Sequence, residues 1–289
     1  MSKKIYVGLS GGVDSAVTAA KLIAAKHDVT GIFMKNWHDE DNPCDVEKDE
    51  LDARAVCKHL SMPLETIDLS KDYYNRVFQI MLNELKQGLT PNPDILCNEF
   101  IKFQALLDHV ESRGADFLAT GHYAGLASFQ GNLTLRLGID KSKDQTYFLS
   151  RLPYKAIEKI CFPLNNIHKE EVRNLAINMR LPNAMKKDST GICFIGERKF
   201  KDFISQYLLD KPGDIVTSDG EKLGEHRGLF FHTIGQRKGL NLGGISGKSE
   251  EPWFALANIS KCSLPSGVAT IPFCRESYSS LMYLRTFLM

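Results

Sequence analysis

The sequence predicts an α/β protein in which a doubly wound parallel sheet is followed by a second, smaller, β-rich domain. Short apolar runs alternate with longer stretches of helical spacing through residues 1–163, which is typical of parallel strands covered by helices. Residues 164–250 show more β character, with short apolar runs and turn signals. The 289 residues are enough for two domains of about 150 residues each.

Four strands are expected in the first domain, each an apolar run of strand length. They are Ile5–Leu9, Asp28–Met34, Leu64–Leu69 and Phe117–Thr120. Three of the expected helices are Ala16–Ala25, Lys71–Lys86 and Asn98–Glu111. A further helix is expected to follow an acidic loop at Asp39–Asp52 and to end near Leu60. Ligands of such sheets bind at the carboxyl ends of strands, so the turn at Ser10, Met34, and Gly121 with His122 are candidate positions.

The turn Ser10–Ser15, between the first strand and the first helix, has the features of an anion site. Backbone N–H groups at a helix start point outward, and the helix dipole favours negative charge there. The two glycines allow the backbone to approach a phosphate, and the two serines add hydroxyl donors. Asp14 beside a phosphate calls for a cation, most simply Mg²⁺. The turn is neither a Walker A loop nor a dinucleotide fingerprint, and an ordinary glycine turn is the alternative interpretation.

Two of the seven cysteines lie in settings that favour reactivity. Cys97 follows the proline-flanked stretch Thr90–Asp94 and falls near the start of the expected helix Asn98–Glu111, and a helix N-terminus lowers a thiol pKa. A buried, inert cysteine is the alternative for Cys97. Cys193 lies in a strand or tight loop with basic residues on both sides, and neighbouring positive charge also lowers a thiol pKa.

Other stretches have local structural signals. Hairpins are expected around Gln130–Asn132 and at the Asp219–Gly220 turn. His168–Asn178 is expected to form a short helix. The stretch Asp140–Leu149 carries lysine, amide and aromatic groups that suit contact with a phosphate backbone, and a solvated helix start is its alternative interpretation.

Composition narrows the class of protein. The 36 basic and 35 acidic residues nearly balance, so a polyanionic partner would need a local basic patch. The sequence shows no signal peptide and no apolar run long enough to span a bilayer. The seven cysteines are odd in number and widely scattered, which argues against a secreted disulfide framework. Because no C-x-x-C pair occurs, a zinc ribbon or a cysteine-bound iron–sulfur cluster has weak support. We expect a reduced, cytoplasmic protein with no membrane contact.

Taken together, these stretches resemble the tRNA-specific 2-thiouridylases of the N-type ATP pyrophosphatase superfamily. The matching blocks are Gly8–Ser15, Thr90–Asn98, Ala119–Tyr123, Lys143–Leu149, Lys186–Phe200 and Thr233–Leu240. The resemblance implies an adenine nucleotide α-hydrolase-like fold, which is Rossmann-like. It also implies ATP-dependent 2-thiolation of the wobble uridine, position 34, of tRNA. In that reaction ATP adenylates the C2 oxygen, and sulfur comes from a cysteine persulfide.

The resemblance also implies roles for single residues. The ATP site, with Mg²⁺, would be Gly8, Leu9, Ser10, Gly11, Gly12, Val13, Asp14, Ser15, Met34 and Gly121. The target base and the tRNA would meet Asn92, Pro93, Asp94, His122, Lys143, Asp144 and Gln145. Cys97 would be the nucleophile and Cys193 the persulfide carrier, and the two would form a disulfide during turnover. A sulfur-relay or cysteine-desulfurase-type protein would supply the sulfur, and no set of resident metal ligands is implied.

Residues 251–289 depart from the family pattern, in which a further small β-barrel helps to hold tRNA. We expect this segment to be a remnant or aberrant start of that barrel, which leaves the barrel largely missing. One alternative function is therefore an impaired thiouridylase that only binds tRNA or carries sulfur. Another is a different ATP pyrophosphatase-type synthetase that uses ammonia, although the glutaminase that usually accompanies such enzymes is not found.

Overall fold

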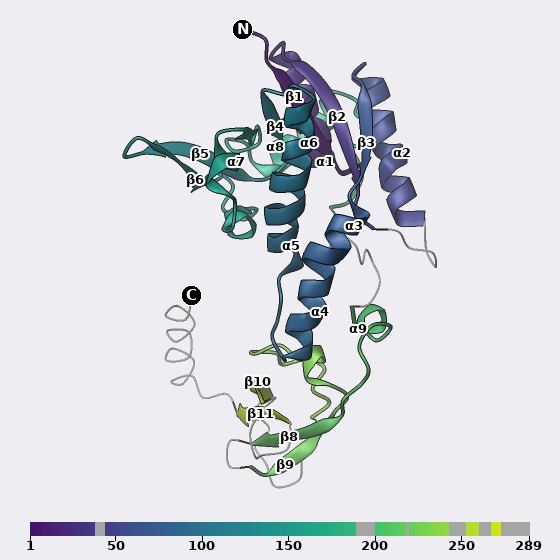
Figure 1. The fold of residues 1–289 in the computed structure, drawn as a ribbon, viewed down its shortest axis with the longest axis vertical. Helices are drawn as coiled ribbons and strands as arrows, with labels where there is room; N and C mark the ends of the chain where they lie inside the picture. The colour runs from purple at the N-terminus through teal and green to yellow at the C-terminus, as the bar shows by residue number, and fades with distance from the viewer. Residues whose placement is uncertain (38–43, 189–199, 218–219, 243–252, 260–266, 273–289) are drawn as a thin grey trace. The chain divides into compact units, whose positions relative to one another are not determined.

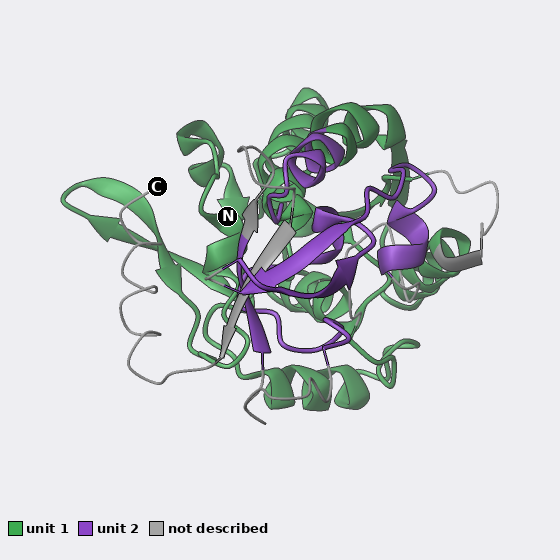
Figure 2. Cartoon of the chain, turned by 90° about the horizontal axis from the view of Figure 1, so that it is seen from below, with its two compact units in different colours: residues 1–79, 92–197 green, residues 80–91, 198–289 purple. Residues whose placement is uncertain are grey.

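The computed structural model describes residues 1–37, 44–188, 200–217, 220–242, 253–259 and 267–272 (Figure 1). The chain forms two compact units, residues 1–79 with 92–197 and residues 80–91 with 198–289 (Figure 2). The sequence predicted a boundary at residue 163, whereas the observed division follows Glu197. The reason is that helix α8 (Lys169–Asn178) buries Val172 and Ala176 in one cluster with Val13 and Val17 of the first helix.

The first unit is built on a five-stranded sheet in the order β3-β2-β1-β4-β7, and every neighbouring pair is parallel. The strands are β1 (Lys4–Leu9), β2 (Asp28–Lys35), β3 (Leu64–Asp68), β4 (Phe117–Ala119) and β7 (Ile160–Cys161). The four strands expected from the sequence are confirmed, and β7 is an additional short one. The strand order reverses between β1 and β4, and this is the switch point at which doubly wound sheets bind ligands.

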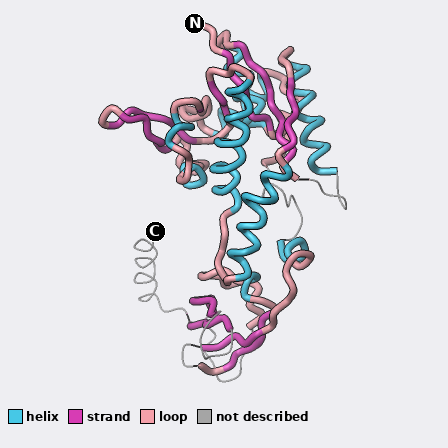
Figure 3. Tube along the Cα trace, viewed as in Figure 1, coloured by secondary structure: helices cyan, strands magenta, loops and turns pink. Residues whose placement is uncertain are grey.

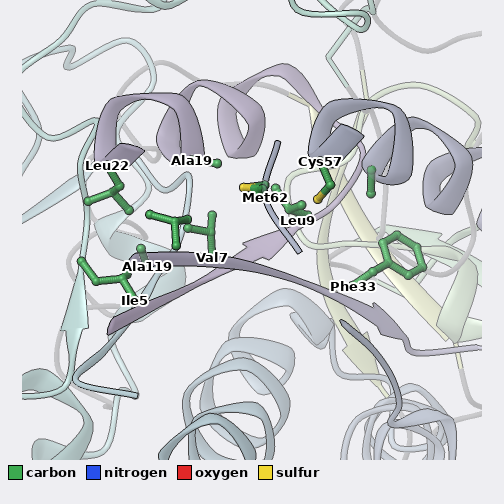
Figure 4. Close-up of a cluster of buried hydrophobic side chains, with 11 residues drawn as sticks. Ile5, Val7, Leu9, Ala19, Leu22, Phe33, Cys57, Met62 and Ala119 are labelled. Atoms are coloured by element: carbon green, nitrogen blue, oxygen red, sulfur yellow. The ribbon is translucent and has the colours of Figure 1, made fainter. Parts of the chain in front are cut away.

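Helices α1 (Val13–Ala24) and α2 (Cys44–His59) cover one face of this sheet. Alternate side chains of β1, Ile5, Val7 and Leu9, pack with Ala19 of α1 and Cys57 of α2 (Figure 4). The acidic loop expected through residue 52 is wrong, because α2 already begins at Cys44. Its acidic side chains are neutralised by contacts that are distant in sequence: Glu50 pairs with Lys35, and Asp49 and Asp52 both pair with Lys186.

The opposite face carries helix α6 (Leu106–Ser112), which packs on β4. Tyr6 of β1 points to this face, where its hydroxyl donates to Glu65 at 2.9 Å, and His109 of α6 lies 3.7 Å from the same carboxylate. Two helical runs, drawn in cyan in Figure 3, each contain a π-helical segment. The runs are α3 (Ser70–Tyr73), η1 (Tyr74–Phe78) and α4 (Gln79–Lys86), and then α5 (Pro93–Leu96), η2 (Cys97–Ala105) and α6.

The second of these helical runs starts earlier in the chain than predicted. It begins at Pro93 rather than at Asn98, because the Asn92 side chain accepts hydrogen bonds from the N–H groups of Asp94 at 3.1 Å and Ile95 at 3.3 Å. A proline at the first helical position suits this start, since its missing N–H has no partner inside a helix. The first run agrees with the helix expected over Lys71–Lys86.

The expected hairpin is confirmed as β5 (Ala124–Phe129) and β6 (Asn132–Leu137), joined through Gln130 and Gly131 with φ of 49° and 81°. Two residues with positive φ between antiparallel strands match the twist of a tight hairpin. Two short helices follow, η3 (Thr146–Leu149), which is a 3₁₀ helix, and α7 (Tyr154–Ile157). The short helix expected at His168–Asn178 is confirmed as α8.

The second unit is rich in strands, as expected. Its sheet has the order β10-β11-β8-β9, with strands β8 (Gly213–Thr217), β9 (Lys222–His226), β10 (Trp253–Ile259) and β11 (Gly267–Pro272). The β8–β9 pair confirms the hairpin expected near Gly220. Ile215, Leu240, Trp253 and Ala255 form the core of this sheet, and α9 (Phe200–Ile204) and η4 (Leu229–Phe231) are its short helices. Across the described parts of both units, no helix has the length and apolar content needed to cross a bilayer.

Candidate active site

The loop between β1 and α1 lies at the switch point of the sheet and is built around a constrained glycine. Gly11 has φ of +71°, and a Cβ at this position would lie 2.5 Å from the carbonyl oxygen of Asp49 in α2. Helix α1 starts after Gly12, which has no side chain to cap it. The first-turn N–H groups therefore lack a side-chain acceptor, which is the arrangement that binds anions at helix N-termini.

The two serines of the loop bond within the loop itself. The Ser15 hydroxyl donates to the carbonyl oxygen of Gly12 at 3.0 Å and accepts from the Ser10 N–H at 3.3 Å. The Ser10 hydroxyl accepts from the Gly12 N–H at 3.4 Å. Both hydroxyls therefore shape the loop, and the expectation that they donate to a phosphate stays a prediction. Backbone N–H groups in the first turn of α1 are further donors for a ligand.

Asp14, in the first turn of α1, has partners that the sequence analysis missed. Its carboxylate accepts from the Lys169 ammonium at 2.7 and 2.8 Å and from the Tyr123 hydroxyl at 2.9 Å. Burial, together with the charge and the hydrogen bond of Asp14, raises the pKa of Tyr123, so the phenol stays protonated. The Lys169 ammonium is thus one positive group beside Asp14, and Mg²⁺ at this position stays a prediction. Within the described residues, no three His, Cys, Asp or Glu side chains gather as a metal site.

Residues 183–188 run beside this loop and add a network of charges. Asn183, of which 5% is exposed, donates to the Gly11 carbonyl oxygen at 2.9 Å. Asp188 lies 2.9 Å from the Lys169 ammonium and also pairs with Arg173. Burial alone would raise the pKa of Asp188, but the hydrogen bonds and charges of Lys169 and Arg173 outweigh it and hold this pKa below its usual value.

Met34 lies next to the last residue of β2, and Gly121 follows β4, so the parallel sheet places both at the same edge as the loop. Gly121 lies against the first turn of α1, where a Cβ would be 2.9 Å from the carbonyl carbon of Asp14 and the nitrogen of Ser15. Met34, in β2, is half-buried. The fold thus gathers the loop, Met34 and Gly121 as the sequence analysis expected.

His122, which follows Gly121, is half-buried between aromatic rings. Its Nδ1 lies 2.8 Å from the Thr120 hydroxyl, and its ring centroid lies 5.8 Å from that of Phe103 and 6.0 Å from that of Phe162. Burial, and then the nearby charge of Lys102, hold the pKa of His122 well below its usual value. The imidazole is therefore neutral at pH 7, so it could contact tRNA as a hydrogen-bonding group but not as a cation.

The stretch Lys143–Gln145 lies between the charge network around Asp14 and the 3₁₀ helix η3. Lys143 is exposed and lies 3.7 Å from Asp188, while Gln145 accepts from the N–H of Tyr123 at 3.0 Å. Asp144 accepts from the Thr146 hydroxyl at 2.6 Å, which fixes the turn that enters η3. The same stretch therefore leads from the Asp14 network towards the helix that carries Cys97.

Cys97 lies one turn inside the helix that begins at Pro93, and only 1% of the residue is exposed. Cys97 therefore lies beyond the first turn, within which the helix dipole mainly acts. Asn98 donates to the carbonyl oxygen of Phe148 at 2.9 Å and so ties this helix to η3. Asn92 and Pro93 form the helix start, and Asp94 is its only acidic residue in the first turn.

Cys193 and the block around it, from Ser189 to residue 199, lie outside the described residues. The structure therefore places Cys97 and the loop in one unit and leaves the predicted pairing of Cys97 with Cys193 as a prediction. Lys186, from the preceding stretch, lies 2.6 Å from both Asp49 and Asp52 of α2.

Comparison with known proteins adds independent findings. Residues 3–197 match the family described as the tRNA methyl transferase HUP domain, and residues 201–262 match the tRNA methyl transferase PRC-barrel domain. The chain is 51% identical over 257 residues to the tRNA-specific 2-thiouridylase MnmA of Proteus mirabilis (strain HI4320), which covers 88% of this chain and 70% of that protein. It is also 51% identical over 253 residues to the protein of that name from Nitrosomonas eutropha (strain DSM 101675 / C91 / Nm57), with coverage of 87% and 70%.

Proposed function

The chain belongs to the tRNA-specific 2-thiouridylase family, and we propose on that basis that it replaces the C2 oxygen of the wobble uridine, position 34, of tRNA with sulfur. The observation that carries this proposal is 51% identity over 88% of the chain. The matching family domain, residues 3–197, includes the loop Ser10–Ser15 and the Cys97 helix. Two features of the structure support it. The loop lies at the ligand-binding edge of the sheet, and the helix with Cys97 is tied to the stretch that follows Lys143–Gln145.

The reaction first needs an activated C2 oxygen, because an oxygen of uracil is a poor leaving group. ATP supplies this chemistry by adenylating that oxygen and releasing pyrophosphate. We assign the pyrophosphate to the first-turn N–H groups of α1 and the Gly8–Ser15 loop, and the adenosine to Met34 and Gly121. The role of these residues is mainly positioning and charge stabilisation. Mg²⁺, when it accompanies ATP, would be held by Asp14 and the phosphate oxygens.

Sulfur must then arrive as a nucleophile. In our proposal Cys193 receives it as a persulfide from a donor protein of the sulfur-relay or cysteine-desulfurase type. The terminal sulfur attacks C2 and AMP leaves, which joins Cys193 to the base through a disulfide. The Cys97 thiolate attacks the Cys193 sulfur, which releases 2-thiouridine and leaves a Cys97–Cys193 disulfide for a dithiol to reduce. In the alternative order, Cys97 attacks the persulfide first, and the released hydrosulfide attacks C2.

The uridine must leave the anticodon stack to be reached, since single-stranded RNA bases are read after they are splayed out. We assign the base to Asn92, Pro93 and Asp94, and flanking tRNA contacts to His122 and Lys143–Gln145. The exposed Lys143 supports this assignment. Asn92 already uses its side-chain oxygen as a helix cap, so its amide N–H groups are what remain for a base. A tRNA substrate places the proposed activity in the cytoplasm.

One assay tests this function. The purified chain is mixed with unmodified tRNA, Mg²⁺-ATP and a persulfide donor, and the digested nucleosides are analysed by mass spectrometry. We expect 2-thiouridine together with AMP, and no 2-thiouridine with Cys193→Ser. AMP without thiolation would favour a protein that only binds tRNA or carries sulfur. Incorporation of ammonia would favour a synthetase of the amidotransferase type, and the absence of AMP would overturn the proposal.

A further inference from the structure

We propose that Lys169 is the phosphate-binding cation of this site, and that in the nucleotide-free protein Asp14 occupies the position of the phosphate as its partner. This inference rests on the proposed function and deepens it. The ligand class is the β- and γ-phosphates of a nucleoside triphosphate, or free pyrophosphate. Lys169 belongs to α8, far from the loop in sequence, and the sequence analysis assigned it no role.

The charges of the loop call for a positive partner if a polyphosphate is to bind there. The loop Ser10–Ser15 holds no cation, and its one charged residue, Asp14, is an anion in the first turn of α1. A polyphosphate that approached these N–H groups would be repelled by that carboxylate unless a positive group stood beside it. Lys169 is the lysine whose ammonium contacts both Asp14 oxygens, at 2.7 and 2.8 Å.

The position of the Lys169 ammonium also suits a phosphate ligand. Side chains of a helix lean towards its N-terminus, so the Asp14 carboxylate and its partner lie on the side of α1 to which the first-turn N–H groups point. Only 13% of the Lys169 side chain is exposed. Its ammonium is therefore largely enclosed beside the loop. Its ammonium also lies 5.7 Å from the centre of the Tyr123 ring. These contacts pre-organise the charge for an anion that enters here.

Lys169 would keep an anionic partner after its ammonium separated from Asp14. Asp188 lies 2.9 Å from the same ammonium and is itself paired with Arg173. The backbone N–H of Lys169 donates to Asp140 at 2.9 Å, which fixes the start of α8. An incoming phosphate could therefore replace Asp14 as an acceptor without leaving the lysine or Asp188 unpaired. In this arrangement Asp188 and Tyr123 are positioning residues.

The test compares Lys169→Met with Lys169→Arg and with a matched control, Lys222→Met. Lys222 also joins two carboxylates, those of Asp214 and Glu225, at 2.7 Å each, but it belongs to the second unit and neither partner is Asp14. Isothermal titration gives Kd for pyrophosphate, Mg²⁺-ATP and AMP, and thermal unfolding gives Tm with and without ATP. AMP lacks the β- and γ-phosphates and so reports on the adenosine end alone.

Loss of one charged hydrogen bond to phosphate should weaken the binding of pyrophosphate and ATP by Lys169→Met about 10- to 100-fold. We expect AMP binding to stay as in wild type, the ATP-induced rise in Tm to disappear, and Lys169→Arg to recover part of the affinity. Lys222→Met should leave all three affinities and the ATP-induced rise in Tm unchanged.

Three results would overturn the inference. Equal losses of AMP and ATP binding would mean that Lys169 only supports the fold. Unchanged ATP and pyrophosphate binding by Lys169→Met, alongside a wild type that binds both, would remove the phosphate role and leave the proposed function standing. A wild-type chain that binds neither ligand would remove the proposed function as well.

Discussion

The two ends of the candidate site are built in different ways. At the nucleotide end, the Ser10–Ser15 loop is held by Tyr123, Lys169 and Asn183, side chains that lie more than a hundred residues away in the sequence. At the cysteine end, the helix start at Pro93 is held by the side chain of its own neighbour, Asn92. A site for a charged ligand thus depends here on tertiary contacts, whereas the start of the helix that carries the cysteine depends on a local signal.

The two ends also differ in exposure. The Asp14 side chain is 32% exposed, while only 1% of Cys97 is exposed. The nucleotide end is open to a ligand in this structure, and the thiol at the cysteine end is covered. The proposed attack by Cys97 therefore requires its cover to move. If the two ends are built separately, substitutions at one should spare the other.

The largest effect expected at the cysteine end is that of Cys97→Ser. A serine hydroxyl is a much weaker nucleophile towards sulfur than a thiolate, so 2-thiouridine should fall to background, while the Kd for ATP stays as in wild type. Mass spectrometry of tRNA nucleosides and titration with ATP measure the two quantities. The control is Cys161→Ala, because burial raises the pKa of that thiol to about 12 and keeps it protonated at neutral pH. A Cys97→Ser variant that still thiolates tRNA would contradict the assignment.

At the nucleotide end, Gly11→Ala should abolish ATP binding. An alanine at φ of +71° would be strained, and its Cβ would meet the Asp49 carbonyl oxygen at 2.5 Å, so the loop must move away from α2. Gly131→Ala is the matched control, because Gly131 has φ of +81° with no atom within 4 Å of a Cβ. That variant should cost about 1–2 kcal/mol of stability from backbone strain and leave ATP binding intact. Equal ATP affinities for both variants would show that α2 does not shape the loop.

Asn92→Ala should have a moderate effect that separates capping from base recognition. Loss of the helix cap should lower the free energy of unfolding by about 1 kcal/mol. We also expect weaker selection of the target base with unchanged ATP binding. Asn92→Ser restores a capping oxygen but not the amide, so it should recover stability without recovering base selection. Urea unfolding and competition between tRNA substrates measure these effects, and a parallel loss of ATP binding would argue against separate ends.

The same contrast explains what the sequence could predict. The order of strand, glycine turn and helix at Lys4–Ala24, and the Gln130–Gly131 turn, are local patterns that the structure confirms. The contact between Lys169 and Asp14 joins residues 155 positions apart, and no local pattern indicates it. The start of α2 was missed for the same reason, because its acidic first turns are stabilised by Lys35 and Lys186 from other segments. A lysine near the start of the predicted helix His168–Asn178 was the only available signal for Lys169.

The smallest predicted effect concerns His122, which lies between the two ends, beside Gly121 and against Phe103 of η2. Its pKa in the folded protein is well below the usual 6.5, so the unfolded chain binds a proton that the folded protein does not. Stability should therefore fall as pH decreases below about 6.5, by at most about 1.4 kcal/mol per pH unit from this residue.

Urea unfolding of wild type and His122→Gln between pH 7 and pH 5 measures this effect, and the variant should lose less stability over that range. His232 in the second unit, with its pKa lowered to about 4 by burial and then by the charges of His226 and Lys201, contributes in the same direction in both proteins and cancels in the comparison. Parallel pH profiles would show that His122 is solvated enough to protonate in the folded state. A protonated His122 could then act as a cation towards tRNA. Both ends of the site would respond to pH through its charge.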